Sequence, residues 1–381
     1  MILTGNIVQN DRVGYGTVSV RDSAIGEISI SEPARDNADW ILPGFIDVHL
    51  HGLGYGGATA EKVSLMAAGA AQTGLTAFCP TMASDSPDKM LDFVKTVRDI
   101  VRKQSAGETK IAGSHLEGPF IEFEHRGGMN PALIRNPDRT EAERLLDMAG
   151  GTLKIMTLSP ELPGAMELTR FLSGHGVRVS AGHTGMTPEQ LPEFVSAGGR
   201  AVCHLFDTFD GRTVAGGVSQ VSLADAAIVG EQLFLELIGD GIHVPPALYK
   251  LAVRAAGAER ILGITDSLTG TGLPDGAYPM TDAGRNFILK NGDVCRLEDD
   301  PSIIVGSCLT QNRAFHNCTR KFGISPQDAA KILSTTPARY LGLDGKGEIR
   351  TGFSADIAVL APDCLTVRKT LIDGRIAYER N

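Results

Sequence analysis

Residues 44–51 read GFIDVHLH, an apolar run that starts after Pro43 and ends in two histidines separated by one residue. Its length and its bounding turn residues are typical of a short buried β-strand. Because successive side chains of a strand point to opposite faces, His49 and His51 are expected to lie on the same face. Similar runs recur along the chain, and most of them also end near a histidine or a carboxylate.

Seven further runs follow at intervals of 23 to 42 residues, which leaves room for a helix in each gap. They are TAFCPTM (76–82), IAGSHLEG (111–118), LKIMTLSP (153–160), VRVSAGHT (177–184), RAVCHLFD (200–207), LFLELIGDG (233–241) and RILGITD (260–266). Helical spacing of apolar residues is clearest at 88–103, 141–149, 187–198 and 245–257. Eight strands alternating with helices predict an α/β fold, a (β/α)8 TIM-like barrel, with a doubly wound sheet as the alternative.

Both ends of the chain depart from this rhythm. Residues 1–43 and 347–381 contain short alternating runs joined by Gly and Asp turns, which is typical of antiparallel strands. Two separate β-rich ends would each leave an exposed edge and an uncovered apolar face. We therefore expect them to form one small β domain, with residues 44–346 as the barrel domain.

The composition restricts the partners. The chain has 381 residues, 36 Lys and Arg against 45 Asp and Glu, and a formal net charge of −9. This acidic balance, without a long basic run, argues against nucleic acid or an anionic membrane as the main partner. No signal peptide is recognisable, and no apolar stretch reaches the roughly 20 residues that span a bilayer. We therefore expect a cytoplasmic protein that acts on a small molecule, with its six scattered cysteines reduced.

Residues that suit metal chemistry fall at the ends of the predicted strands. They are His49 and His51 in the first strand, Glu117 in the third, His183 in the fifth, His204 in the sixth, His243 just after the seventh and Asp266 in the eighth. In a barrel these positions converge on the carboxyl-terminal mouth, where such folds build their active sites. Imidazole and carboxylate donors without thiolates predict a site for one or two divalent ions. We favour Zn, with Fe, Mn or Co as alternatives.

Two of these residues suit proton transfer. Asp266 has no cation beside it in sequence, and it suits an acid/base that takes a proton from hydrolytic water and returns it to the leaving group. His243 suits a donor to a carbonyl oxygen as negative charge develops. We expect His125, His175 and His316 to be structural, and the glycines of HGLGYGG to form a flexible loop at the mouth.

A series of motifs carries a family resemblance. PGFIDVHLHG, HLEGPF, GHT, CHLF, GDGIHV and GITDS follow in that order, with ADIAVL near the end of the chain. Together they resemble the amidohydrolase superfamily, and HLEGPF with GDGIHV resembles its N-acetylglucosamine-6-phosphate deacetylase family. The resemblance implies a barrel with a small β-sandwich formed by both termini. It also implies a metal-dependent hydrolase that removes acetate from an amino-sugar nitrogen, commonly as a homodimer.

The resemblance also implies roles for individual residues. Glu117, His183 and His204 match the ligands of the principal metal, His49 and His51 match those of a second metal bridged by Glu117, Asp266 matches the acid/base, and His243 matches the residue that holds the substrate carbonyl. The departures concern substrate contacts. Met129 stands in GGMNP where members usually have a sugar-binding His, and Asp207 and Thr208 stand where an Asn-Ala pair helps to bind the 6-phosphate.

These departures leave the substrate open. A carboxylate at Asp207 would repel a phosphate dianion, whereas Arg212 could supply a bidentate phosphate contact. The first hypothesis is deacetylation of N-acetylglucosamine-6-phosphate or a related N-acetylhexosamine. The second is hydrolysis of another N-acyl compound, such as an N-acyl amino acid, or of an unphosphorylated N-acetyl sugar. The third is a barrel that has lost catalysis, which the complete set of ligands and Asp266 argues against. The long segment 267–306 is either a lid or a dimer contact.

Overall fold

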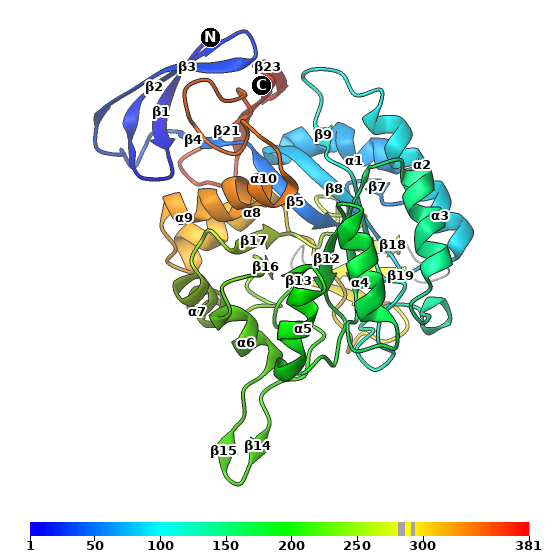
Figure 1. Ribbon diagram of the computed structural model, residues 1–381. Helices are drawn as coiled ribbons and strands as arrows, with labels where there is room; N and C mark the ends of the chain where they lie inside the picture. The colour runs from blue at the N-terminus through cyan, green and yellow to red at the C-terminus, as the bar shows by residue number, and fades with distance from the viewer. Residues whose placement is uncertain (281–285, 291–293, 381) are drawn as a thin grey trace.

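Eight parallel strands form the central sheet of the computed structural model, which describes residues 1–280, 286–290 and 294–380 (Figure 1). In chain order and in spatial order they are β5 (Phe45–Leu50), β8 (Leu75–Ala83), β10 (Ser114–Glu117), β11 (Leu153–Leu158), β12 (Arg178–Ala181), β13 (Gly199–Val202), β16 (Phe234–Ile238) and β17 (Ile261–Ile264). The short β9 (Lys110–Ile111) pairs with β8. All eight predicted runs form strands.

Backbone hydrogen bonds join the last strand to the first. The Asp266 amide donates to the His49 carbonyl at 2.9 Å, and the His51 amide donates to the Ser267 carbonyl at 2.8 Å. The sheet therefore curls into a nearly closed barrel, which confirms the predicted barrel over the doubly wound alternative. It also places His49 and His51, at the end of the first strand, beside Asp266, at the end of the eighth strand.

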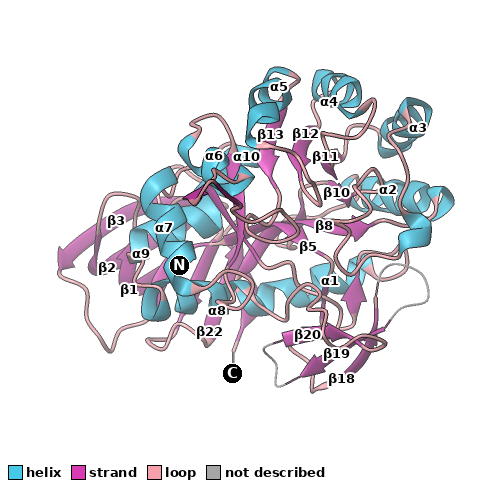
Figure 2. Cartoon of the chain, turned by 90° about the horizontal axis from the view of Figure 1, so that it is seen from below, coloured by secondary structure: helices cyan, strands magenta, loops and turns pink. Residues whose placement is uncertain are grey.

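Helices cover the outside of the barrel (Figure 2). They are α1 (Val63–Ala70), α2 (Pro87–Val101), α3 (Arg139–Ala149), α4 (Ala165–Gly174), α5 (Leu191–Ser196), α6 (Leu223–Val229) and α7 (Pro246–Ala256), followed by α8 (Gln311–His316), α9 (Pro326–Ala330) and α10 (Thr336–Leu341). In α2 the buried residues are Met90, Phe93, Val94 and Val97, the spacing of one helix face. These faces pack on the strands and hold the barrel wall in place.

A second buried cluster fills the inside of the barrel. It joins Ile46, Cys79, Ile155 and Leu262 from different strands with Tyr340 of α10. Residues from strands all around the barrel can meet only along its axis. The amino-terminal half of the barrel is thus packed with apolar side chains, which leaves the carboxyl-terminal mouth for polar groups.

The two termini form one seven-stranded sheet. Its strands are β1 (Ile2–Val8), β2 (Val13–Arg21), β3 (Ala24–Glu32), β4 (Trp40–Pro43), β21 (Ile357–Leu360), β22 (Val367–Ile372) and β23 (Arg375–Glu379), in the spatial order β23-β22-β21-β4-β1-β2-β3. The Ile25 amide donates to the Phe353 carbonyl and the Ala355 amide to the Ser23 carbonyl, both at 2.8 Å, so the sheet curls back on itself. Ile7, Ile41 and Ile357 are buried within it. The predicted joining of the termini is confirmed, and the boundaries at 43/44 and 346/347 stay predictions.

Two excursions leave the barrel. The hairpin of β14 (Val214–Ala215) and β15 (Val218–Ser219) projects from the body (Figure 1). The segment 267–306 contains a three-stranded antiparallel sheet of β18 (Gly276–Pro279), β19 (Asn286–Lys290) and β20 (Val294–Leu297), and its residues 281–285 and 291–293 lie outside the described part. No described helix is long and apolar enough to cross a membrane.

Candidate metal centre

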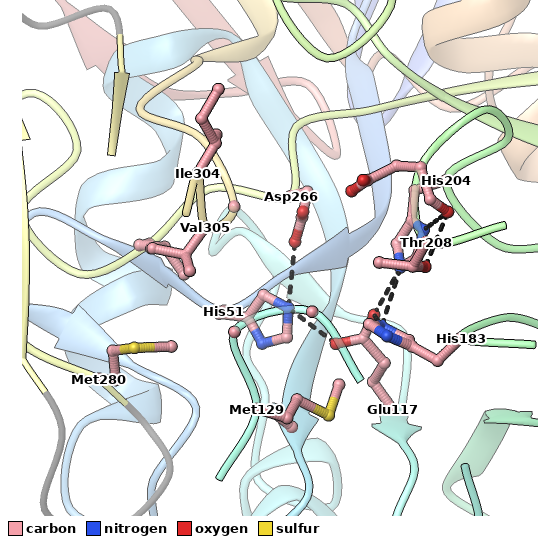
Figure 3. A pocket seen from close by; sticks show the side chains of 16 residues that line it. His51, Glu117, Met129, His183, His204, Thr208, Asp266, Met280, Ile304 and Val305 are labelled. Atoms are coloured by element: carbon pink, nitrogen blue, oxygen red, sulfur yellow. Dashed lines mark hydrogen bonds and ion pairs between the residues drawn. The ribbon is translucent and has the colours of Figure 1, made fainter. Parts of the chain in front are cut away.

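The five predicted ligands and the predicted acid/base, Asp266, meet at the carboxyl-terminal mouth of the barrel. His49 lies in β5 and His51 directly follows it, Glu117 is the last residue of β10, and three residues each lie two positions beyond a strand: His183 after β12, His204 after β13 and Asp266 after β17. Figure 3 shows five of these six side chains around one hollow, with His51, Glu117, His183 and His204 turned toward one another. All six side chains are buried.

The first group of donors surrounds one oxygen of Glu117. Its Oε1 lies 2.9 Å from His204 Nε2 and 3.1 Å from His183 Nε2. The two Nε2 atoms are 3.2 Å apart. Three strands thus bring three donor atoms into one triangle.

The second group surrounds His51. Its Nε2 lies 3.2 Å from the other Glu117 oxygen, Oε2, 3.2 Å from His49 Nε2 and 3.1 Å from Asp266 Oδ1. His49 Nε2 lies 3.4 Å from Asp266 Oδ1 and 3.4 Å from Glu117 Oε1. Glu117 therefore lies between the two groups, as a bridging carboxylate would: Oε2 contacts His51, and Oε1 contacts His49 as well as the first group.

These separations fit ligands of a first-row metal. Nitrogen and oxygen ligands about 2.0–2.1 Å from a tetrahedral ion lie roughly 3.3 Å from one another. His49, His51 and Glu117 offer donor atoms that all lie within 4.8 Å of one another, and all three residues are buried. The donors present thus fit one divalent ion, and the two groups together have room for a second.

Burial opposes charge on these groups, but their pairings outweigh it. Burial lowers the pKa of His51, yet hydrogen bonds to Asp266 and Glu117 raise it to about 9. Burial raises the pKa of Glu117, yet the charge of His49 and hydrogen bonds from His183 and His204 bring it well below its usual range. The centre therefore favours an anionic carboxylate beside positive charge, which a divalent ion would supply.

The far nitrogen of three of the imidazoles, those of His49, His183 and His204, faces an acceptor. His183 Nδ1 lies 2.9 Å from the His125 carbonyl oxygen and His204 Nδ1 lies 3.3 Å from the Asp207 carbonyl oxygen. His49 Nδ1 lies 2.9 Å from Glu236 Oε2. A proton on each of these three Nδ1 atoms leaves the lone pair on Nε2, which points into the centre.

Sequence reasoning missed two residues beneath the centre. Glu236 lies in the middle of β16 and Cys203 directly precedes His204, and both are buried. Cys203 Sγ lies 3.5 Å from His49 Nδ1 and 3.9 Å from Glu117 Oε1. Burial raises the pKa of Cys203, which keeps it a neutral thiol rather than a thiolate ligand. The signal for Glu236 was present in the sequence, because an acid interrupts the apolar run LFLELI.

His243 is fixed by a residue that the sequence reasoning did not single out. Its Nδ1 lies 2.7 Å from Asp240 Oδ2, and the backbone amide of His243 donates to Asp240 Oδ1 at 3.1 Å. Burial lowers the pKa of His243, but the hydrogen bond and charge of Asp240 outweigh burial and raise it above its usual value. The cationic form, which can donate from Nε2, is therefore favoured.

Three centre residues adopt a left-handed backbone without being glycine. The φ angles are 51° at His183, 23° at His204 and 49° at Asp266. Such conformations cost on the order of 1–3 kcal/mol each and collect at functional sites. The same unusual turn, two residues beyond three different strands, aims each side chain into the mouth.

The wall of the hollow contains most of the predicted substrate contacts. Met129, Asp207 and Thr208 line it, together with Met280, Ile304 and Val305 from the 267–306 segment. Arg212 is not among the described lining residues. Its side chain is 61% exposed and holds Asp225 with two hydrogen bonds of 2.8 and 2.6 Å. His243 also lies outside the described lining of this hollow.

The chain is similar to known amidohydrolases over nearly its whole length. A model described as Amidohydrolase family matches residues 281–377. Over 98% of its length the chain is 30% identical to the N-acetylglucosamine-6-phosphate deacetylase of Bacillus subtilis (strain 168), with 95% of that protein covered. The chain belongs to the N-acetylglucosamine-6-phosphate deacetylase family. The family predicted from the motifs is confirmed, and a member of this family is a metal-dependent hydrolase of an amide C–N bond.

Other members extend the likeness. The N-acetylgalactosamine-6-phosphate deacetylase of Escherichia coli O157:H7 is 30% identical over 96% of this chain and 94% of its own. A structure of a Mycobacterium smegmatis N-acetyl-D-glucosamine-6-phosphate deacetylase variant in complex with N-acetyl-D-glucosamine-6-phosphate aligns with a TM-score of 0.88 at 28% identity, over 99% of both chains. The Thermotoga maritima enzyme aligns with a TM-score of 0.87 at 28% identity, over 100% of both chains. The family therefore includes members named for different amino sugars.

Proposed function

We propose that this enzyme hydrolyses the N-acetyl group of N-acetylglucosamine-6-phosphate, or of a related N-acetylhexosamine, to acetate and the free amino sugar. The observation that carries the proposal is the Glu117-centred set of donors beside Asp266, in a chain that matches named deacetylases end to end. We propose Zn as the ion, with Fe, Mn or Co as alternatives. Bound there, the ion would supply Lewis acidity toward the acetyl carbonyl and acidify water.

The protein groups supply the proton transfers. Asp266 takes a proton from the water whose oxygen attacks the acetyl carbon, and later delivers a proton to the sugar nitrogen as the C–N bond breaks. His243, whose cationic form the neighbouring Asp240 carboxylate favours, donates to the acetyl oxygen as negative charge develops there. The role of His243 stays a proposal, because His243 lies outside the described lining of the hollow.

A second candidate substrate class is favoured by the wall of the hollow. The Asp207 carboxylate belongs to a lining residue, and Met129, Met280, Ile304 and Val305 add apolar surface. A carboxylate about 4 Å from a phosphate would oppose its binding by roughly 4 kcal/mol at an effective dielectric constant of 20. This favours an unphosphorylated N-acetyl sugar or another N-acyl compound, such as an N-acyl amino acid.

One experiment separates the two candidates. Acetate release is measured on metal-loaded enzyme with N-acetylglucosamine and N-acetylgalactosamine, each with and without the 6-phosphate. A preference for a phosphorylated sugar supports the first candidate, and activity on the neutral sugars alone supports the second. Failure to hydrolyse all four would refute the amino-sugar proposal and leave other N-acyl compounds.

The homodimer and the cytoplasmic location also stay proposals. Val214, Val218 and Val221 on and beside the projecting hairpin are 70%, 64% and 64% exposed, which suits a surface covered by a second copy. Light scattering after size-exclusion chromatography tests this. A dimer that Val214→Ser with Val218→Ser converts to a monomer supports it, and a monomeric wild-type enzyme contradicts it.

A further inference from the structure

We propose that Glu236 is a positioning residue that fixes the ring of His49 for metal binding. Its Oε2 lies 2.9 Å from His49 Nδ1, and both side chains are fully buried. Neither Glu236 nor His49 is among the described residues that line the hollow. The inference rests on the metal centre of the proposed function, and it assigns a role to a residue outside the predicted ligand set.

The surroundings of Glu236 leave part of its carboxylate without a partner, which is unusual for a buried acid that only stabilises the fold. Its second oxygen, Oε1, has no hydrogen-bond partner among the described residues. A buried carboxylate with one unsatisfied oxygen is costly unless positive charge lies nearby. When His49 Nε2 binds a divalent ion, the ring carries part of that charge, and its Nδ1–H becomes a stronger donor to Glu236.

The position of the proton on the His49 ring decides whether a metal ion can bind, because His49 Nε2 lies among three other donor atoms. Its Nε2 lies 3.2 Å from His51 Nε2 and 3.4 Å from both Glu117 Oε1 and Asp266 Oδ1. A proton on Nε2 instead of Nδ1 would point into this group of donors and exclude the ion. A carboxylate at Nδ1 holds the proton there.

The other neighbours of His49 are weaker holders. Cys203 Sγ lies 3.5 Å from Nδ1, and a neutral thiol is a weak acceptor. The His115 ring packs edge-on at 4.7 Å between centroids, and its own nitrogens are held by the Val48 carbonyl and the Thr157 hydroxyl. His183 and His204 are held by backbone carbonyls, which no side-chain substitution removes. Glu236 is thus the holder that mutation can test.

The test measures metal affinity rather than catalysis. Metal-free wild-type enzyme, Glu236→Gln and Glu236→Leu are titrated with Zn(II) against a competing chelator, and the bound metal per chain is determined. Glu236→Gln keeps the size and an acceptor oxygen but loses the charge. We expect it to bind the ion held by His49 roughly 10–100-fold more weakly, the usual effect of removing such a partner. Glu236→Leu should bind at least as weakly, and His49→Gln sets the limit of complete loss.

Ser180→Ala is the matched control. Ser180 lies in β12 of the same barrel, is fully buried, and its Oγ also lacks a hydrogen-bond partner among the described residues. Removing this oxygen should leave the metal affinity unchanged. A second readout is the Co(II) absorption spectrum, which should change in Glu236→Gln because the His49 nitrogen has moved.

The outcomes separate this inference from the proposed function. Wild-type affinity and spectrum in Glu236→Gln would overturn the role of Glu236 and leave the proposed function intact. A wild-type metal content that His49→Gln does not alter would overturn it as well. A wild-type enzyme that binds no divalent ion would instead overturn the metal centre itself. If Glu236→Leu fails to fold, the Gln variant decides.

Discussion

Replacing Asp266 with asparagine tests the proposed proton transfer most directly. Asp266 Oδ1 lies 3.1 Å from His51 Nε2 and 3.4 Å from His49 Nε2, so an asparagine oxygen of the same shape can keep these contacts. The amide cannot accept and return a proton at neutral pH. General acid–base catalysis contributes about 10²–10⁴ in rate, which corresponds to roughly 3–5 kcal/mol of activation free energy. We therefore expect Asp266→Asn to lose 10²–10⁴-fold in kcat while it retains its metal.

The assay pairs initial rates of acetate release with the metal content of the same samples. Asp85→Asn is the matched control, because Asp85 is a buried carboxylate just beyond the mouth end of β8 that binds the Ser86 amide and Lys89. It should remain within a few-fold of the wild-type rate. An Asp266→Asn enzyme within tenfold of wild type with full metal would refute the acid/base role. Loss of rate together with loss of metal would reassign Asp266 to metal binding.

Three further changes follow from the same geometry. Dialysis against a chelator should abolish acetate release and lower Tm, and added divalent ion should restore both; unchanged activity after complete removal of metal would contradict the centre. Asp207→Asn should raise kcat/KM for a 6-phosphorylated over a neutral sugar by about 5–30-fold, because partial exposure reduces the Coulomb repulsion to roughly 1–2 kcal/mol. Asp240→Asn should lower the pKa of His243, so the alkaline limb of the kcat/KM profile moves to lower pH. Because Asp240 raises the pKa of His243 in the folded protein, the pairing stabilises the fold fully below about pH 6.5, the ordinary pKa of histidine. This stabilisation is lost as the pH rises through the pKa of His243 in the folded protein. The denaturation midpoints of the wild-type enzyme and Asp240→Asn should therefore converge at high pH.

The barrel and its ligands could be predicted because they follow from local patterns. An apolar run of four to eight residues with helical spacing after it identifies a βα unit from the sequence alone. Parallel strands in a barrel place all their carboxyl ends on one face. The positions of His49, Glu117 and His204 at such ends were therefore enough to predict that they meet.

The partners of these ligands could not be predicted, because they depend on the order and register of the strands around the barrel. Glu236 is 187 residues from His49 in sequence. An acidic residue within an apolar strand is visible in the sequence, but the sequence does not indicate that this residue contacts His49. The carbonyls of His125 and Asp207 carry no sequence signal as acceptors, since every residue has one. For Arg212 the sequence suggested a contact that the structure does not show. Its charge suggested binding to phosphate, but its side chain donates to Asp225, 13 residues away.

The left-handed turns show why a site of this kind is assembled by the whole fold rather than by its motifs. His183, His204 and Asp266 each follow a strand by two residues and have positive φ, although none is a glycine. If the backbone continued as an extended strand at these three positions, it would run on along the barrel wall and would not turn the side chain into the mouth. At about 1–3 kcal/mol each, the three turns cost several kcal/mol in backbone conformation. Each turn instead makes one contact with another strand possible: His183 and His204 reach Glu117 of β10, and Asp266 reaches His51 beyond β5.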